Sequence, residues 1–508
     1  MPITDENLEA MFTFGTETGG VVDQPPFRML ILGDWSGDAE KKDLDDRRLL
    51  EIDRDNFDEA IRKMGASVNL GLGEEQEVSL RFTELDDFHP DRIFEQVAVF
   101  TELRDLRKRL KDPNEFNAAA NDVRSWIGSK PNVDSEPAPP VAAAESVESA
   151  ESGDLLSQIL TQPSGGTAVA RVKGSDEINR LLREIVTPHV LRIDENEQSQ
   201  MIAAVDEATS GVMRKILHDH KFQALEAAWR GLYFLVRRAE TSPDLKLYIL
   251  DVSKDELIDS LRSAESLSGT QLYKTLVRDT VETPGAEPWA VVVGNYAFLP
   301  EKDDVAALIR ISRLAEAANA PFISHMRPEV LGVHTLDGNA DPTDWNLSTD
   351  TDASKLWATL RGLNESRYIG LTIPRFLVRL PYGADTDPLE RFSFEEFEGK
   401  PEHDLYLWAN SAFACALLLA QSYSEYGWDM GESLMQDLDG LPLHMYKQDG
   451  ETVFQPCAEV QLTQVACEEI MEHGLMPLIS YKNTDRVKLA RFQSITDPVK
   501  GLKGRWNT

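Results

Sequence analysis

Runs of apolar residues on consecutive positions alternate along the chain with stretches of helical periodicity. The runs occupy residues 27–32, 245–250, 289–296, 321–326 and 368–374. Between them, residues 303–320 repeat apolar side chains at helical spacing, and Ser253 with Glu256 has the spacing of a capping box that begins another helix. Strands that are apolar at every position are buried on both faces, and amphipathic helices supply the cover. The pattern therefore predicts an α/β fold with a largely parallel sheet.

The first part of the chain has the same α/β pattern on a smaller scale. After the run at 27–32, Asp55 is positioned to cap a helix in which Phe57, Ile61 and Met64 recur at helical spacing. Residues 77–82 alternate polar and apolar side chains, as in a half-buried strand, and a longer helix is predicted from about residue 90 to 110. One stripe of that helix is apolar: Ile93, Val97, Phe100, Leu103, Leu106 and Leu110.

The C-terminal part ends in a different pattern. Residues 405–428 predict one core helix, whose apolar run is far shorter than the ~20 residues that cross a bilayer. A short acidic helix at 463–473 follows, and then strands at 475–481 and 486–495. We expect these last two strands to pair antiparallel, as an appendage to the parallel sheet.

A change of composition divides the chain. Residues 129–154 are rich in Pro, Ala, Ser and Glu and contain Lys130 as their only base. Such a segment buries too little apolar surface to offset its ordering entropy, so we expect a flexible linker. The predicted organisation is a first module at 1–128, a linker with a short amphipathic helix at 129–170, and a second module at 171–508.

The charge and the cysteines narrow the function classes. The formal net charge is −35, from 87 acidic and 52 basic residues, and this should repel nucleic acid. An acidic chain could dock on a basic protein surface, or the charge could serve solubility alone. The three cysteines lack C-x-x-C spacing, so neither a disulfide framework nor a zinc site is expected, and the N-terminus lacks the pattern of a secretion signal. We expect a cytoplasmic protein without a metal, a cofactor or direct membrane insertion.

The run at 27–32 ends in Gly33-Asp34-Trp35-Ser36-Gly37, which presents Ser36 as a candidate nucleophile. Gly-Asp-x-Ser faintly resembles the block of one esterase class, but no Asp-x-x-His follows near the C-terminus to supply a base. The favoured interpretation is a turn that ends the strand, because the glycines permit unusual backbone angles and the polar side chains can bond their own backbone. Without a convergent catalytic set, a structural or assembly protein is expected rather than an enzyme.

Longer stretches resemble a specific family. Residues 26–37, 51–64 and 79–97 resemble the small sheath subunit of the type VI secretion system, the TssB or VipA family. Residues 221–236, 245–257, 287–298, 374–383 and 491–498 are similar to its large subunit, TssC or VipB. The two subunits, usually separate chains, here share one polypeptide, which fixes their ratio at one to one.

The resemblance implies a contractile sheath. Its subunits form a helical homopolymer around an inner tube and contract to propel the tube into a target cell. The implied partners are other copies of the chain, an Hcp-like inner tube protein, baseplate and distal cap proteins, and a ClpV-type AAA+ unfoldase. Two alternatives stay open on the residues alone: an α/β hydrolase that uses Ser36, and a monomeric soluble binding module.

The resemblance also assigns candidate sites. Strands that interlace between neighbouring subunits would lie at residues 11–15 and about 487–495, with residues 15–20 as a hinge. Their candidate residues are Met11, Phe12, Thr13, Phe14, Val487, Leu489, Arg491 and Phe492. The acidic helix would face the inner tube through Glu468, Glu469 and Glu472, or be only solvated. The unfoldase would bind Leu155, Leu156, Ile159 and Leu160, unless this stripe is a helix docked on its own module.

Overall fold

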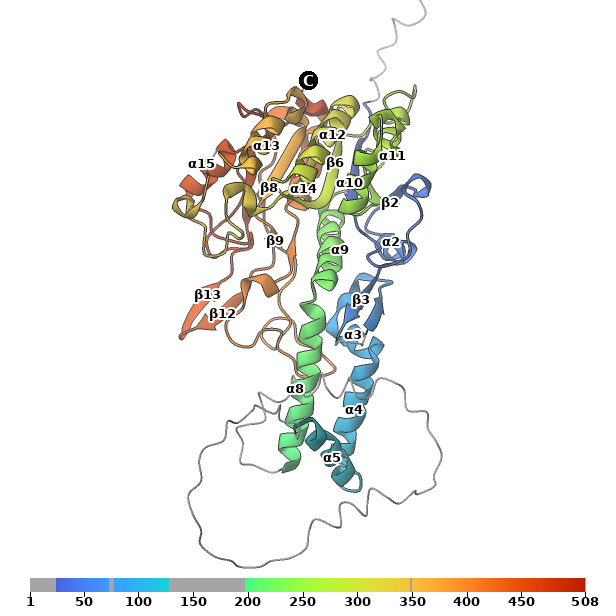
Figure 1. The fold of residues 1–508 in the computed structure, drawn as a ribbon, viewed down its shortest axis with the longest axis vertical. Coiled ribbons are helices and arrows are strands. Elements are labelled where there is room, and N and C mark those ends of the chain that lie inside the picture. Colours follow the sequence, from blue (N-terminus) through green and yellow to red (C-terminus); the bar gives the residue numbers. More distant parts are fainter. Residues whose placement is uncertain (1–23, 73–76, 128–196, 348–349, 508) are drawn as a thin grey trace, which may run out of the picture. The chain divides into compact units, whose positions relative to one another are not determined.

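The computed structural model describes residues 24–72, 77–127, 197–347 and 350–507 (Figure 1). The chain divides into two compact units, each built from separated stretches of sequence. Unit 1 contains residues 1–68, 79–93 and 217–508, and unit 2 contains residues 69–78 and 94–216. Each unit therefore combines residues from before and after the Pro/Ala/Glu segment.

A nine-stranded sheet forms the centre of unit 1, in the order β11-β15-β14-β8-β7-β6-β1-β5-β2. The six strands from β14 to β5 in this order are parallel, and β15, β11 and β2 are antiparallel to their neighbours. Their bounds are β1 Phe27–Gly33, β2 Leu50–Ile52, β5 Leu245–Asp251, β6 Val291–Phe298, β7 Phe322–Met326, β8 Ile369–Ile373, β11 Asp437–Leu438, β14 Leu475–Ser480 and β15 Val487–Leu489. The predicted α/β class with a largely parallel sheet is confirmed.

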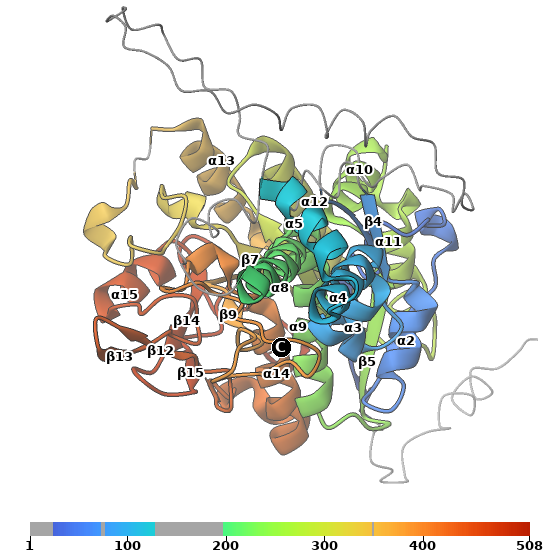
Figure 2. The same cartoon turned by 90° about the horizontal axis from the view of Figure 1, so that it is seen from below.

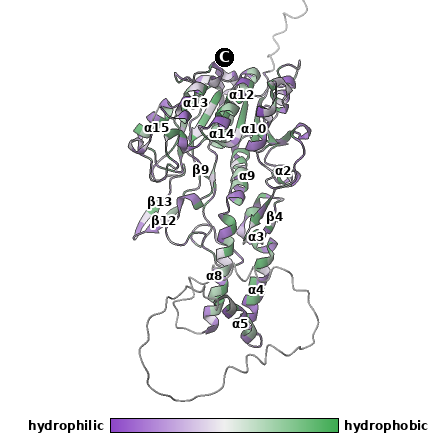
Figure 3. Ribbon diagram, in the orientation of Figure 1, coloured by the Kyte–Doolittle hydropathy of each residue, from purple (hydrophilic) through white to green (hydrophobic). Residues whose placement is uncertain are grey.

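Helices cover both faces of this sheet. In Figure 2, α10 (Lys254–Ser263), α12 (Lys302–Ala318) and α13 (Asp352–Arg361) lie on one side, and α14 (Ala412–Tyr426) lies on the opposite side. The helix α9 (His220–Arg238) packs on α14, and α15 (Gln464–Glu472) packs on β14. The strands around β6 carry the hydrophobic colour in Figure 3 because they are rich in Val, Ile and Phe, and every residue of β7 and β8 is buried.

Smaller elements complete unit 1. The capping box of Ser253 and Glu256 is present at the start of α10, as predicted. Two-residue strands β9 (Phe376–Leu377) and β10 (Trp408–Ala409) pair with each other, and β12 (Met445–Gln448) pairs with β13 (Glu451–Phe454) in a hairpin. Unit 1 also contains α2 (Phe57–Met64) and α11 (Gln271–Tyr273), whereas β3 (Ser67–Gly71), β4 (Glu77–Arg81) and α3 (Pro90–Gln96) each have residues in both units. Short 3-10 or π turns connect several of these elements.

The described part of unit 2 is mainly helical. Its described helices are α4 (Ala98–Lys111), α5 (Phe116–Ile127) and α8 (Glu197–Leu217), of which Leu217 already belongs to unit 1. Arg107 of α4 forms a bidentate ion pair with Asp206 of α8, with 3.1 Å between Nη2 and Oδ2. Arg124 of α5 pairs with Glu197 at the start of α8. Among the described residues, the helices that flank the Pro/Ala/Glu segment on its two sides, α5 and α8, therefore contact each other.

Several predictions about helices were wrong in detail. The helix α2 begins at Phe57 after Asn56, and the carboxylate that accepts backbone N–H groups before it belongs to Asp53 rather than Asp55. The helix predicted from 90 to 110 is two helices, because Val97 is extended (φ −91°, ψ 122°). This break allows the rings of Phe94 and Phe100 to contact at 5.2 Å, whereas a continuous helix would set them about 120° apart.

The C-terminal elements also differ from the prediction. The core helix begins only at Ala412, after β10. The strands β14 and β15 are antiparallel, as predicted, but they are no appendage, because Leu475 of β14 pairs in parallel register with Leu371 of β8. The strand β15 ends at Leu489, since the chain then turns and the N–H of Ile495 donates to Ile369 O at 3.0 Å.

Candidate functional site: the junction of the N-terminal segment with the main sheet

The strand β1, from the first module of the sequence, lies between two strands of the second module. It pairs with β5 over seven residues, from Phe27 opposite Leu245 to Gly33 opposite Asp251. On its other side, Met29 pairs with Val291 of β6. Because β1 is apolar on both faces and hydrogen-bonded on both edges, it belongs to the core of this sheet.

A buried turn after β1 is fixed by Asp251, the last residue of β5. The N–H of Trp35 donates to Asp251 Oδ1 at 2.8 Å, and the Trp35 indole N–H donates to Leu250 O at 3.1 Å. The backbone O of Trp35 accepts from the indole of Trp229 of α9 at 3.0 Å. The Trp35 ring is completely buried and meets the Trp229 ring edge-on at 5.4 Å. The turn is thus held from the sheet and from the helix that covers it.

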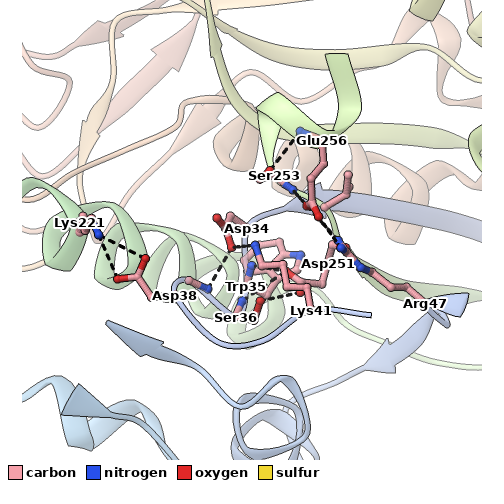
Figure 4. Close-up of polar contacts among 12 residues, drawn as sticks. Asp34, Trp35, Ser36, Asp38, Lys41, Arg47, Lys221, Asp251, Ser253 and Glu256 are labelled. Atoms are coloured by element: carbon pink, nitrogen blue, oxygen red, sulfur yellow. Dashed lines mark hydrogen bonds and ion pairs between the residues drawn. The ribbon is translucent and has the colours of Figure 1, made fainter. Parts of the chain in front are cut away.

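Ser36 is part of the same turn. Its hydroxyl donates to Asp251 Oδ2 at 2.7 Å, and its N–H donates to Oδ1 at 3.3 Å (Figure 4). Gly37 follows at φ +63°, where a Cβ would stand 2.4 Å from Ser67 O. A nucleophilic serine needs a base such as histidine within hydrogen-bond reach, and the partner of Ser36 is a buried carboxylate that also accepts two N–H groups. This geometry makes Ser36 a turn residue and gives the hydrolase alternative no support.

Ion pairs surround the turn at the surface (Figure 4). Arg47 forms a bidentate pair with Glu256 of the α10 capping box and also donates to Asp251 O at 2.8 Å. The hydrogen bond from Arg47 is the largest of the effects that lower the pKa of Glu256 to about 2. Lys41 contacts Asp34 at 2.6 Å, and Lys221 of α9 contacts Asp38 at 3.3 Å.

The opposite end of β1 has an aromatic anchor. The Phe27 ring lies 4.7 Å from the Tyr423 ring of α14 and 5.4 Å from that of Trp428. The indole N–H of Trp428 donates to Pro25 O at 2.8 Å. The guanidinium of Arg28 lies 4.1 Å from the centre of the Trp289 ring, which is within the range of a cation–π contact. Residues of the second module therefore bind both ends of β1.

The candidate residues of the interlaced strands have unequal positions. Val487 and Leu489 are completely buried in β15, which is paired on one side with β14 and on the other with β11. Phe492 is buried as well, and Arg491 is exposed. Met11, Phe12, Thr13 and Phe14 lie outside the described residues, as do residues 15–20, Leu155, Leu156, Ile159 and Leu160.

The acidic helix α15 presents its glutamates on two faces. Glu468 and Glu472 are exposed and one helical turn apart, on the same side as Val465, which is 63% exposed. Glu469 is half-buried, and its carboxylate lies 3.6 Å from the His473 ring. The three predicted contact residues are thus a pair that faces solvent and a third that interacts within the subunit.

Within the described ranges, no group of three or more His, Cys, Asp and Glu side chains is arranged to hold a metal ion. The three cysteines are free and buried, and burial raises the pKa of Cys467 to about 11. Among the described helices, none combines the length and apolarity needed to cross a membrane.

Comparison with known proteins identifies the class to which this arrangement belongs. Residues 199–496 match the family described as EvpB/VC_A0108, tail sheath N-terminal domain. Residues 11–127 match the family described as type VI secretion system, VipA, VC_A0107 or Hcp2. The chain therefore belongs to the tail sheath protein family of type VI secretion systems, and it carries segments of both sheath families in one polypeptide. Proteins of this class are structural and not enzymes.

A particular relative supports the assignment. Over 304 residues the chain is 37% identical to the type VI secretion system sheath protein TssC1 of Pseudomonas aeruginosa. The aligned part is 59% of this chain and 61% of the relative, so the chain spans about three fifths of the length of TssC1. Val487–Leu489 falls near the end of the match to the N-terminal domain family.

The sequence did not reveal the residues that hold β1. In the sequence, Asp251 indicates only the end of a strand, and Glu256 indicates only the acidic residue of a capping box. One feature of the sequence did indicate that Asp251 forms hydrogen bonds. An aspartate directly after a run of apolar strand residues has a buried backbone, so its carboxylate needs hydrogen-bond donors from the protein. Nothing in the sequence indicates that these donors come from Trp35 and Ser36, 215 or more positions earlier.

Proposed function

We propose that the chain is the complete repeating subunit of a contractile injection sheath, which polymerises helically around an inner tube and contracts to propel the tube into a target cell. The observation that carries the proposal is the position of β1. The VipA-like segment contributes a central strand to the sheet of the VipB-like segment, so residues of both sheath components share one sheet. A subunit that must transmit force needs such a continuous core.

The sequence modules are part of this proposal. The small-subunit module is 1–128, the large-subunit module is 171–508, and the segment 129–170 connects them. The ion pair between Arg124 and Glu197 keeps the described residues before and after the segment 128–196 close together. The segment that connects the two modules therefore does not need to span a long distance. The covalent connection ensures that the small-subunit and large-subunit modules are present in equal number.

Neighbouring subunits are linked by strand exchange in this proposal. Residues 11–15 of one subunit pair with β15 of the next. Since β15 already has β14 and β11 as neighbours, the arriving strand replaces β11, whose pairing with β15 involves only two residues. Val487 and Leu489 keep their buried side chains throughout, because strand exchange at an edge changes backbone partners only.

The proposed partners follow from the class of protein. An Hcp-like inner tube protein contacts α15 through Glu468 and Glu472, with Glu469 as a supporting residue. Baseplate and distal cap proteins bind the ends of the polymer, and a ClpV-type unfoldase binds the stripe from Leu155 to Leu160. The protein acts in the cytoplasm.

Electron microscopy tests the proposal. We expect the purified protein to form tubes, and to do so more readily with an inner tube protein present. Monodisperse particles under all conditions would contradict the proposal, and hydrolysis of a p-nitrophenyl ester that is lost in Ser36→Ala would favour the hydrolase instead.

A further inference from the structure

A buried ionic network joins α9 to the 378–402 loop, which follows β9 in unit 1. Glu226 of α9 is completely buried, and Glu396 of the loop is 1% exposed. Arg379 binds both carboxylates: its Nε lies 3.0 Å from Glu226 Oε1, and its two terminal nitrogens lie 2.8 and 3.0 Å from the oxygens of Glu396. Arg230, one helical turn after Glu226, donates to Glu226 Oε1 at 2.6 Å. Two positive and two negative side chains thus compensate each other in the interior.

This network anchors the 378–402 loop. The N–H of Tyr382 donates to Glu396 Oε2 at 2.8 Å, and the N–H of Glu396 donates to Tyr382 O at 2.9 Å. The hydroxyl of Tyr382 accepts from Arg230 Nη2 at 3.1 Å. Residues 383–395 between them are all described and contain no helix or strand. The position of the loop therefore depends on the contacts of Glu396 rather than on regular backbone hydrogen bonds.

His218 adds a histidine to the network. It lies in the break between α8, which ends at Leu217, and α9, which begins at His220, and its side chain is 13% exposed. Its Nε2 atom is buried, makes no hydrogen bond within the described residues, and lies 3.5 Å from Glu396 Oε1. The ring stacks on that of Phe397, with 6.1 Å between the centres. A protonated imidazole carries a hydrogen on both nitrogens, so it can donate from Nε2 to the carboxylate as a charge-assisted hydrogen bond.

Glu396 is an anion over the whole pH range in which histidines titrate. Burial alone would raise its pKa, but the charge of Arg379 and the hydrogen bonds to the carboxylate together lower the pKa to about 2. Burial raises the pKa of Tyr382 to about 12, so this neighbour stays neutral. Burial lowers the pKa of His444, whose ring centre lies 6.3 Å from that of Phe397. The charge of His218 is therefore the variable one in the network.

A second histidine lies beside the loop, in the VipA-like segment. The ring of His89 meets that of Tyr382 edge-on at 5.0 Å. Its Nδ1 accepts the N–H of Asp91 at 3.2 Å and lies 3.7 Å from the Asp91 carboxylate, which in turn accepts the N–H groups of Glu390 and Arg391. A proton on His89 acts on Asp91 and not on the buried network, so substitution can distinguish the two histidines.

We propose that His218 is a pH-responsive clamp, whose protonated imidazole donates from Nε2 to Glu396 and holds the 378–402 loop on α9, and whose neutral form releases this contact. A histidine that gains an anionic partner in the folded protein stabilises the fold at low pH, and this contribution is lost as the pH rises through about 5–8. The loop is therefore held more tightly in mildly acidic solution. The clamp acts within one subunit and does not depend on polymerisation.

Hydrogen exchange of two amides tests the clamp. The N–H groups of Tyr382 and Glu396 lose their acceptors whenever the loop leaves the network. After correction for the intrinsic exchange rate, we expect their protection in the full chain to be about tenfold higher at about pH 5.5 than at about pH 7.5. In His218→Gln, which cannot gain a proton, the protection should change by less than about twofold between these pH values. The melting temperature of His218→Gln at about pH 7.5 should be nearly that of the unaltered chain, because the neutral ring makes no hydrogen bond from Nε2.

Two further histidine variants are matched controls. His220→Gln changes an exposed histidine in the first turn of α9, and His89→Gln changes the histidine beside Tyr382. Both should retain the increase in protection at acidic pH. Equal protection of the unaltered chain at both pH values would overturn the clamp without the need for any variant. An increase that persists in His218→Gln, or that is lost in either control, would assign the pH dependence to another group and overturn the role of His218.

Discussion

The Ser36 hydroxyl donates to Oδ2 of Asp251 at 2.7 Å, across 215 positions of sequence. The same carboxylate accepts the N–H groups of Trp35 and Ser36, so one side chain satisfies three donors of the turn after β1. Asp251 is 9% exposed, and water cannot easily replace it. This contact joins the VipA-like segment to the VipB-like segment in the centre of the sheet.

Replacement of Asp251 by alanine should destabilise the subunit strongly. The three donors would remain buried without an acceptor, and each such group costs about 1–3 kcal/mol, so we expect a loss of roughly 2–4 kcal/mol after local relaxation. Chemical denaturation checks this. The matched control is Asp38→Ala, which removes a surface ion pair with Lys221 and should change stability by about 1 kcal/mol or less. Equal stability of the two variants would contradict the role assigned to Asp251.

Stability should fall between about pH 4.5 and pH 2 through Glu256. Its pKa in the folded state is about 2, below the ordinary value of 4.5, because Arg47 stabilises the carboxylate. A carboxyl with a lowered pKa stabilises the fold fully above its unfolded pKa and ceases to do so as the pH drops through its folded pKa. We therefore expect Glu256→Gln to lower the melting temperature at pH 6 and to have little effect at pH 2. A constant difference over this range would show that Arg47 does not act through the charge of Glu256.

Charge reversal on α15 should prevent assembly on the inner tube. Glu468→Lys with Glu472→Lys inverts the exposed pair without touching the buried side of the helix, so the subunit should fold normally and fail to form sheaths on tubes. Glu469→Gln should assemble, because this residue faces His473. Electron microscopy with purified tubes distinguishes the variants. Normal sheaths from the double variant would mean that this face is only solvated.

Phe14→Pro should disrupt polymerisation or contraction. Proline removes a backbone donor from the proposed exchanged strand, and each ladder bond contributes about 0.5–1.5 kcal/mol, repeated at every subunit of the polymer. The melting temperature of the dispersed subunit should stay nearly unchanged. Phe14→Leu keeps both the donor and the apolar character and should assemble. If sheaths of the Phe14→Pro variant form and contract normally, the proposed strand exchange between subunits is wrong.

Leu156→Asp with Ile159→Asp should block recycling and leave contraction intact. The two charges interrupt the apolar stripe at 155–160 that we propose as the unfoldase site. The measurement is disassembly of contracted sheaths by a ClpV-type unfoldase and ATP, and Ser157→Asp with Gln158→Asp provides a control with the same added charge off the stripe. If sheaths of the Leu156→Asp, Ile159→Asp variant are still disassembled, the unfoldase binds another segment.

The sequence by itself determined the elements and the family. Consecutive apolar positions located β1, β5, β6, β7 and β8, since such runs are compatible with burial on both faces. The capping box of Ser253 and Glu256 located the start of α10. The resemblance of two separate stretches to two sheath subunits agreed with the family matches. These features are local, or are carried by residue identity, and need no knowledge of which strands are neighbours.

Only the tertiary structure decided how the elements combine. The sequence of a strand that is apolar on both faces does not indicate which strands are its neighbours. The sequence therefore did not predict that β1 lies between β5 and β6, or that β14 belongs to the same sheet. For the same reason Asp251 and Glu256 gave no sign that they bind Ser36 and Arg47. The end of β15 at Leu489 is followed by a turn in which the N–H of Ile495 bonds to Ile369, 126 positions earlier in the chain. Local periodicity fixes which side chains must be buried, and long-range packing alone selects the partners that bury them.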